Sequence, residues 1–275
     1  MPDLATLDRR TVEAAGTRWS YLASASAGPP LLMLTGALGE ADFGSDLLRR
    51  LGKGAALVAP DYPAVRGLDV MIAGLEAILD EQRIEGAHVL GGSFGGLIAQ
   101  AFAAQRPERV RSLLLSHTGV PATRAGGGAA LALLNLFPER LLRGLFRKRL
   151  RPAVAIAGPE ALSRFNETVS RLEKKALLSR LRLAIEIGRR HGNHAGAPFR
   201  GPVLILQGAD DPLIPPASRS MLAARFPQAD CHLFSGTGHL AALLRPDAFA
   251  AKVMDFIRRV EGAAQLDEQP DQVSG

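Results

Sequence analysis

The stretch Ala87–Gly96, with the sequence AHVLGGSFGG, decides the fold of this 275-residue chain. Its apolar first half predicts a buried strand, and the glycines that follow predict a sharp turn into a helix. Ser93 is the centre of the pattern G-x-S-x-G, in which the residues two before and two after the serine must lack bulk. Such a turn lifts the Ser93 hydroxyl clear of the sheet and brings the backbone N–H of Phe94 to the same spot. This arrangement is typical of a nucleophile beside an oxyanion hole.

A glycine-rich turn after a strand can also hold a phosphate group. The segment lacks the Gly-Lys-Ser/Thr ending of a P-loop and the G-x-G-x-x-G spacing of a dinucleotide site. We therefore favour the nucleophile interpretation of Ser93 and keep the phosphate-binding turn as its alternative.

Apolar runs alternate with helix-like stretches on both sides of this segment. The expected strands span residues 30–35, 55–59, 87–90, 112–116, 203–207 and 231–234, and the expected helices span 68–82, 97–105 and 248–260. Strands that are apolar throughout and separated by helices indicate a parallel sheet covered on both faces. Residues 11–24 favour an antiparallel hairpin at its edge. The predicted fold class is α/β, with a mostly parallel central sheet and helices on both faces.

The alternation stops between Pro121 and Pro202, where no strand is predicted. Leu- and Arg-rich helical runs at 131–151 and 163–189 indicate a helical insertion over the carboxyl edge of the sheet. We expect three parts along the chain. They are a core made of residues 1–120 and 201–262, a helical cap over 121–200, and a polar, disordered tail over 263–275.

Charge is concentrated in this insertion. The chain carries 33 basic and 27 acidic residues, but residues 122–200 alone hold 16 basic residues, 5 glutamates and no aspartate. This excess could attract an anionic substrate or an anionic lipid surface to the cap, and the alternative is a solvated helix face. Nucleic acid is not expected as a partner, because aromatic residues make up only 5% of the chain and no recognition motif accompanies the charge.

Composition excludes several other classes of protein. A hydrophobic content of 47% excludes an intrinsically disordered chain. The single cysteine, Cys231, excludes an intrachain disulfide and a zinc ribbon. No window of 18 consecutive apolar residues predicts a transmembrane helix, and the N-terminus lacks the pattern of a secretory signal, so we expect a cytoplasmic protein.

A serine nucleophile needs a base and an acid to orient it. His239 follows the last predicted strand in the glycine-rich loop Gly236–His239, whereas His88 and His232 lie within strands. His191 and His194 form an H-x-x-H pair without further ligands nearby, so we expect no metal site there. The acid is expected in the loop after the strand 203–207.

Asp211 is the preferred acid, Asp210 is the fallback, and a solvated turn is the alternative interpretation of that loop. Ser93, Asp211 and His239 follow one another in the order serine, acid, histidine. Each lies just beyond its own predicted strand. Because parallel strands end at the same edge of a sheet, we expect the three side chains to meet there.

Three segments together resemble the α/β-hydrolase superfamily over nearly the whole chain. They are Gly91–Gly96, Gly208–Pro215, which matches G-x-x-D-x-x-x-P, and Gly236–His239, which matches G-x-G-H. The resemblance implies that Asp211 is the acid and that the insertion is a cap domain. A weaker similarity to maspardin-like members rests on Asp61-Tyr62-Pro63 and on residues 92–100.

The chain departs from the family pattern at two places. The oxyanion loop usually reads His-Gly and here reads Thr35-Gly36-Ala37-Leu38-Gly39, although the backbone N–H of Ala37 can still donate. Loss of the histidine removes a support for this loop. Tyr62-Pro63 stands where many members have Arg-Gly.

The resemblance implies a serine hydrolase that cleaves carboxylic esters through an acyl-enzyme, with neither a metal nor an organic cofactor. A serine at position 93 argues against haloalkane dehalogenases and epoxide hydrolases, which attack with a carboxylate. The same three residues could act on a thioester, an amide, a carbon–carbon bond or in perhydrolysis. A non-catalytic, maspardin-like binding or scaffold protein is the remaining alternative. Candidate substrate-binding residues are Leu38, His117, Phe137 and Leu141, for which core packing or a strand cap is the alternative role.

Overall fold

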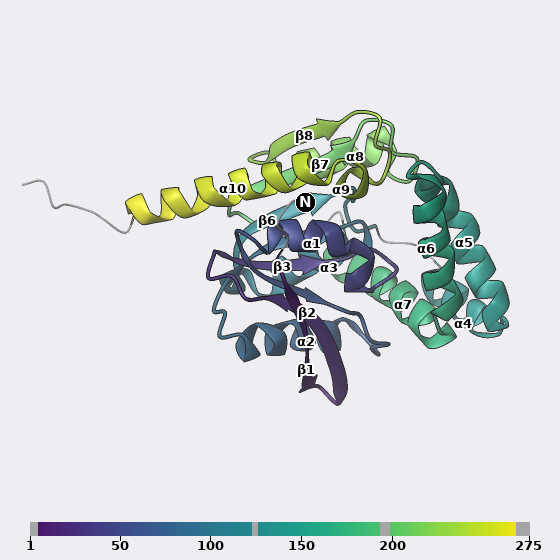
Figure 1. The fold of residues 1–275 in the computed structure, drawn as a ribbon. Coiled ribbons are helices and arrows are strands. Elements are labelled where there is room, and N and C mark those ends of the chain that lie inside the picture. The colour runs from purple at the N-terminus through teal and green to yellow at the C-terminus, as the bar shows by residue number, and fades with distance from the viewer. Residues whose placement is uncertain (1–4, 123–125, 193–198, 268–275) are drawn as a thin grey trace, which may run out of the picture.

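The computed structural model describes residues 5–122, 126–192 and 199–267. Its centre is an eight-stranded sheet with the order β1-β2-β4-β3-β5-β6-β7-β8 (Figure 1). The strands are β1 (Leu7–Ala14), β2 (Thr17–Ser24), β3 (Pro30–Leu34), β4 (Ala56–Pro60), β5 (Ala87–Gly92), β6 (Val110–Ser116), β7 (Val203–Gly208) and β8 (Asp230–Phe234). β1 and β2 form the expected antiparallel hairpin, β2 runs antiparallel to β4, and all other neighbours are parallel. The predicted fold class is confirmed.

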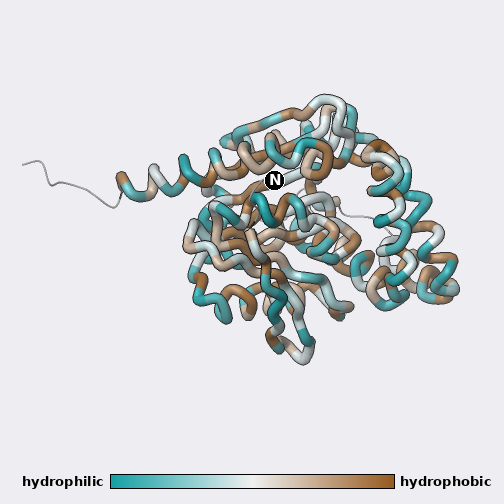
Figure 2. Tube along the Cα trace, in the orientation of Figure 1, coloured by the Kyte–Doolittle hydropathy of each residue, from teal (hydrophilic) through white to brown (hydrophobic). Residues whose placement is uncertain are grey.

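Helices cover both faces of this sheet. One face is covered by α1 (Ser45–Leu51), α9 (Ala241–Leu244) and α10 (Pro246–Asp267), and the other by α2 (Leu68–Glu81), α3 (Phe94–Gln105) and α8 (Pro216–Arg225). Two short 3-10 turns, η1 (Ala41–Gly44) and η2 (Pro107–Arg109), complete the core. The central strands bury side chains on both faces, which explains their continuous apolar runs. Figure 2 shows this hydrophobic concentration in the middle of the molecule.

Four further helices lie between β6 and β7, and we call them the cap helices. They are α4 (Gly127–Asn135), α5 (Glu139–Ala155), α6 (Gly158–Arg171) and α7 (Lys174–His191). The two long runs expected from the sequence are each broken. The first breaks at Pro138, whose backbone is extended at ψ 145° and which has no N–H to donate. The second breaks at Leu172 and Glu173, which are also extended.

The last helix is longer than expected. α10 continues to Asp267, so residues 263–267 are helical and their predicted disorder is wrong. Alanine, glutamine and leucine have high helix propensity and extend the helix without an apolar stripe. The rest of the predicted tail, residues 268–275, lies outside the described residues. Among the described helices, none is both long enough and apolar enough to cross a membrane.

The register of the parallel strands sets up the site. Gly92 of β5 pairs with Ser116 of β6, and Ser116 pairs with Leu206 of β7. The segments that follow these strands therefore emerge side by side at the carboxyl edge of the sheet. This is the edge where ligands bind in open α/β sheets.

Candidate active site

Ser93 occupies a strained turn between β5 and α3. Its backbone angles are φ 53° and ψ −115°, a region that a non-glycine residue adopts only when its surroundings enforce it. The neighbouring glycines are required by close backbone packing. A Cβ atom on Gly91 would lie 2.5 Å from the carbonyl oxygen of Gly95, and one on Gly95 would lie 2.1 Å from that of Leu34. The turn predicted from the sequence is therefore present, with Ser93 at its tip.

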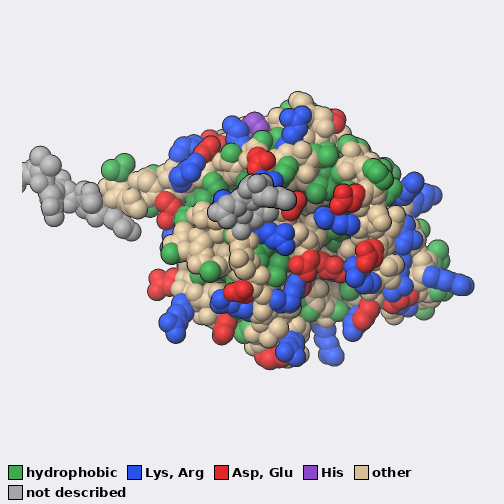
Figure 3. All heavy atoms as spheres, in the orientation of Figure 1, with side chains coloured by type: hydrophobic (Ala, Val, Ile, Leu, Met, Phe, Trp, Pro, Cys, Tyr) green, Lys and Arg blue, Asp and Glu red, His purple; other side chains and the backbone are tan. Residues whose placement is uncertain are grey.

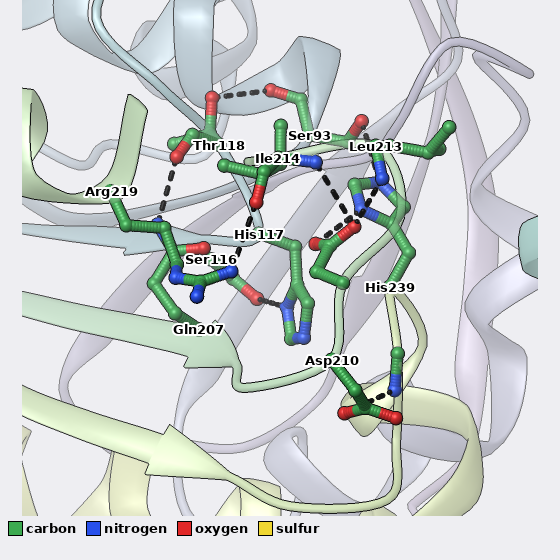
Figure 4. A network of polar contacts seen from close by, with 12 residues as sticks. Ser93, Ser116, His117, Thr118, Gln207, Asp210, Leu213, Ile214, Arg219 and His239 are labelled. Atoms are coloured by element: carbon green, nitrogen blue, oxygen red, sulfur yellow. Dashed lines mark hydrogen bonds and ion pairs between the residues drawn. The ribbon is translucent and has the colours of Figure 1, made fainter. Parts of the chain in front are cut away.

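A chain of two hydrogen bonds connects Ser93 to a buried carboxylate (Figure 4). The Ser93 Oγ and the His239 Nε2 are 3.0 Å apart, and the His239 Nδ1 lies 2.7 Å from the Asp211 Oδ2. The other oxygen of Asp211 accepts the backbone N–H groups of Leu213 and Ile214, at 2.8 and 3.1 Å. All three sequence-predicted residues thus meet at one edge of the sheet.

The charge of Asp211 is stabilised by these contacts. Burial alone would raise the pKa of Asp211, but its hydrogen bond to His239, the charge of His239 and the two backbone N–H donors bring this pKa below its usual value. An ionised Asp211 favours a proton on the Nδ1 of His239 and leaves the Nε2 free to accept the proton of Ser93. Asp210, the fallback acid, instead accepts the N–H of Gly238 and supports the histidine loop.

Two backbone N–H groups near Ser93 were expected to form the oxyanion hole. Phe94 begins α3, so its N–H has no acceptor inside the helix, and Ala37 lies in the turn after β3. Among the described residues, neither N–H donates a hydrogen bond. The loop runs close to the nucleophile, since a Cβ atom on Gly36 would lie 3.8 Å from that of Ser93. The N–H groups of Phe94 and Ala37 are therefore free to donate, and their role as oxyanion donors stays a prediction.

A cavity of about 200 Å³ opens onto Ser93 and His239. Its wall is mostly apolar and includes Met33, Leu38, Phe43, Leu47, Val154, Phe165 and Leu243. Leu38 and His117 line it as expected, but Phe137 and Leu141 do not. The expectation for those two residues is wrong because α5 reaches the cavity with its last turns, through Leu150, Ala153 and Val154. In its first turn α5 buries Leu142 and leaves Leu141 45% exposed.

His117 is buried beside the proposed base. It directly follows β6 with a positive φ of 46°, and its ring lies edge to face against that of His239, with the ring centres 5.6 Å apart. Its Nδ1 lies 2.8 Å from the Ser116 Oγ, and its Nε2 has no hydrogen-bond partner in the described chain. Burial, together with the charge of His239, lowers the pKa of His117 to about 4. His117 is therefore neutral at neutral pH and brings a polar ring nitrogen to the cavity wall.

Three charged residues of the cavity, Glu40, Asp46 and Arg164, were not predicted from the sequence. Glu40 directly follows the oxyanion loop, and this position could have identified it as a cavity residue. Arg164 is one of 16 basic residues in 122–200, and no neighbouring residue distinguishes it from the others. Only one member of the H-x-x-H pair lies within the described residues. His191 ends α7 with its Nε2 3.1 Å from the Gln105 Nε2, and His194 lies outside the described residues.

Comparison with known proteins places this geometry in a family. The sequence profile of the alpha/beta hydrolase family matches residues 31–252, which is most of the chain. The chain belongs to the alpha/beta hydrolase family. This result agrees with the resemblance carried by the serine, acid and histidine segments, and the expectation of a hydrolase is confirmed at that level.

Relatives within the family carry different names. The chain is 28% identical to a poly(3-hydroxyalkanoate) depolymerase of Ectopseudomonas oleovorans, over 88% of both chains. It is 29% identical to a 2-hydroxymuconate semialdehyde hydrolase of a Pseudomonas species, over 93% of this chain and 95% of the relative. A thermophilic esterase from Thermogutta terrifontis shares the fold with a TM-score of 0.74 and 17% identity, over 92% and 99% of the two chains.

Proposed function

We propose that the protein hydrolyses carboxylic esters, with Ser93 as nucleophile, His239 as base and Asp211 as the acid that orients it. One observation carries the proposal. His239 lies 3.0 Å from the Ser93 Oγ through its Nε2 and 2.7 Å from the Asp211 Oδ2 through its Nδ1, and Ser93 lines a mainly apolar cavity. An apolar acyl group can occupy such a wall while its carbonyl carbon lies against the Ser93 Oγ.

The reaction proceeds through an acyl-enzyme. The Ser93 Oγ attacks the carbonyl carbon as the Nε2 of His239 takes its proton, and the N–H groups of Ala37 and Phe94 stabilise the oxyanion. His239 then donates that proton to the leaving alkoxide. Water, deprotonated by His239, attacks the acyl-enzyme and releases the carboxylic acid. Every step uses side chains and backbone N–H groups of the chain, so we propose no cofactor.

Hydrolysis of p-nitrophenyl acetate, butyrate, hexanoate, decanoate and palmitate tests this function. The cavity is smaller than the ~300–1,000 Å³ usual for drug-sized ligands, so we expect the highest kcat/KM for short acyl chains. Ser93→Ala is the control and should be inactive. A wild type that hydrolyses none of these esters, and whose Ser93 is not labelled by a fluorophosphonate, would favour the scaffold alternative.

Hydrolysis of a carbon–carbon bond is the second candidate. It is supported by the relative named as a 2-hydroxymuconate semialdehyde hydrolase and by Arg164, a cation on the cavity wall that could pair with a substrate carboxylate. 2-Hydroxymuconate semialdehyde offered beside p-nitrophenyl butyrate separates the two candidates. A higher kcat/KM for the semialdehyde, lost in Arg164→Gln, would favour this one. The thioester, amide and perhydrolysis alternatives have no such support.

We also propose that residues 121–200 form a cap domain that contacts an anionic lipid surface. α4, α5 and the turn between them expose apolar side chains, with Leu133 at 56% and Leu136 at 78%, together with Leu141 and Leu145. Basic residues accompany them and form no ion pair with the described residues, namely Arg140, Lys148, Arg149 and Arg151. Figure 3 shows basic and hydrophobic side chains together along the edge where Figure 1 places α5. Apolar and cationic groups together are typical of interfacial helices.

Co-sedimentation with vesicles tests this contact. We expect binding to phosphatidylglycerol vesicles, little binding to phosphatidylcholine vesicles, and loss of binding in Lys148→Glu/Arg149→Glu. Lys252→Glu, on exposed α10 far along the chain, is the matched control. Equal binding of all three proteins would contradict the proposal. An effect of the double variant only on soluble anionic esters would instead favour an anionic substrate.

A further inference from the structure

Arg180 of α7 is a buried cation that points into the core rather than into solvent. It is 7% exposed and forms no ion pair with any described residue. Its Nη2 donates a hydrogen bond of 2.7 Å to the carbonyl oxygen of Leu38, in the oxyanion loop. The rest of α7 is fixed to core loops as well, because the Ser179 hydroxyl donates to Val65 and the Glu186 carboxylate accepts the N–H of Leu68. α7 is thus hydrogen-bonded directly to the oxyanion loop, to the segment after β4 and to the start of α2.

The oxyanion loop is held from two sides. On the core side, the Tyr62 hydroxyl donates to the carbonyl of Thr35, and the Tyr62 N–H donates to that of Gly39, each at 2.8 Å. The Asp61 carboxylate accepts the N–H of Ala41 at 2.8 Å. On the cap side, in the part of the chain that the structure describes, Arg180 alone holds a loop carbonyl by a hydrogen bond.

The guanidinium packs directly against the loop. Gly39 has a positive φ of 69°, and a Cβ atom there would lie 2.3 Å from the Nη2 of Arg180. Glycine at this position therefore lets the loop turn and lets the cation approach it. Tyr62 and Arg180 together occupy the supporting role left open where the loop has Thr35 in place of the usual histidine.

Stability alone does not explain a cation at this place. Burial lowers the pKa of Arg180 to about 10, because the charged form loses hydration, while Tyr62 and Glu40 favour the charged form. The Nε and Nη1 have no partner among the described residues. A buried charge that lacks an ion pair is costly, and an apolar side chain of similar volume would avoid that cost. What Arg180 adds is a strong, charge-assisted hydrogen bond to one carbonyl of the loop.

We propose that Arg180 is a positioning residue for the oxyanion hole, which makes the geometry of the hole depend on the docking of α7. The inference rests on the proposed ester hydrolysis. The N–H of Ala37 stabilises an oxyanion only within hydrogen-bond distance, so a loop that drifts outward loses catalysis while the cavity keeps its substrate. If α7 moved away from the core, the oxyanion loop would lose its hydrogen bond from Arg180 at the same time as the active site opened.

Arg180→Met and Arg180→Lys test this role, and Arg182→Met, an exposed arginine on the same helix, is the matched control. For Arg180→Met we expect kcat to fall about 10- to 100-fold, less than for outright loss of a donor, with KM changed by less than about threefold. The Ki of a trifluoromethyl ketone, whose Ser93 adduct places an oxyanion in the hole, should rise by the same factor as kcat/KM falls. Arg180→Lys should show a smaller loss, and Arg182→Met none.

Each outcome decides the proposal. Wild-type kcat and Ki in Arg180→Met overturn it, as does a lower Tm with unchanged kcat and Ki, which means a structural role only. If Arg180→Met does not fold, Arg180→Lys decides, and an unchanged Ki in that variant overturns the proposal. If the wild type hydrolyses esters and the Arg180 variants have the same kcat and Ki, only this inference is contradicted and the proposed function stands. A wild type that neither hydrolyses esters nor binds the ketone contradicts the proposed function and this inference together.

Discussion

Two of the non-glycine residues with positive φ, Ser93 and His117, directly follow adjacent strands at the site. Neither could be recognised as strained from its residue type. For Ser93 the sequence still predicted the conformation, because the flanking glycines mark the turn. For His117 nothing in Ser116-His117-Thr118 signals it, and the sequence left a pocket role and a strand cap equally open. Backbone strain held at a site by its surroundings has consequences for stability that can be measured.

Ser93→Gly should stabilise the protein while it abolishes hydrolysis. Glycine adopts φ 53° without strain, and relief of about 1–3 kcal/mol exceeds the added entropy of the unfolded chain, so we expect Tm to rise by a few degrees. Ser93→Ala is the control, since it removes the hydroxyl and keeps the strain. Calorimetry that gives both variants the same Tm would show that the turn is not strained.

The buried His117 predicts a loss of stability in mild acid. Its pKa is lowered from 6.5 to about 4, so the unfolded chain binds this proton more tightly than the folded protein. Stability therefore falls as the pH drops from about 6.5 towards 4. His117→Asn, which tolerates a positive φ, should lose less Tm over this interval than the wild type. Parallel curves of Tm against pH would contradict the pKa assignment.

At the scale of the element, the strands and helices that are most deeply buried were the ones predicted best from the sequence. The central strands were predicted within a few residues because they are buried on both faces and are therefore apolar throughout. α1 and α8 are short and half exposed, and the sequence analysis did not identify them. In the cap, the apolar side chains divide between the core, the cavity and the surface, and the spacing of apolar residues alone does not tell which of these each one faces. For that reason Phe137 and Leu141 were wrongly expected in the cavity, and Val154 and Phe165 were not anticipated.

Acyl-chain preference can test which residues of α5 line the cavity. Val154→Phe should narrow the cavity, move the optimum of kcat/KM to shorter p-nitrophenyl esters and lower activity on hexanoate by about tenfold or more. Leu141→Phe is the matched change in the first turn of the same helix and should leave the profile unchanged. A shift produced by Leu141→Phe would mean that the first turn of α5 lines the substrate path.

The oxyanion loop makes a second prediction at this scale. Tyr62→Phe removes the hydroxyl that donates to the carbonyl of Thr35 and leaves a buried acceptor unpaired, which costs about 1–3 kcal/mol of stability. We expect kcat to fall with little change in KM. Combined with Arg180→Met, the loss in kcat should differ from the product of the single losses, because both side chains hold one loop. Strict multiplicativity in the double variant would show that the two supports act on separate structures.

At the scale of the whole molecule, the hydrogen-bonded residues Ser93, His239 and Asp211 come from distant parts of the chain. Ser93 and His239 are 146 residues apart, and the cap helices lie between β6 and β7, which pair directly. Chain order and strand ends were enough to predict that the three residues meet, because parallel strands share one carboxyl edge. Arg180 could not be predicted in this way, since its contact with Leu38 depends on how the cap docks on the core.

The insertion between two paired strands also bears on how this protein can vary. Closing a longer flexible segment between fixed ends adds only about 0.6 kcal/mol for each doubling of its length. We therefore expect the junction of β6 and β7 to accept insertions of other lengths, provided that they replace the packing of Leu183 and Ile187 on the core. Descendants or engineered chimaeras with a different insertion could reach new substrates at little thermodynamic cost, provided that the new segment restores a donor to the carbonyl of Leu38.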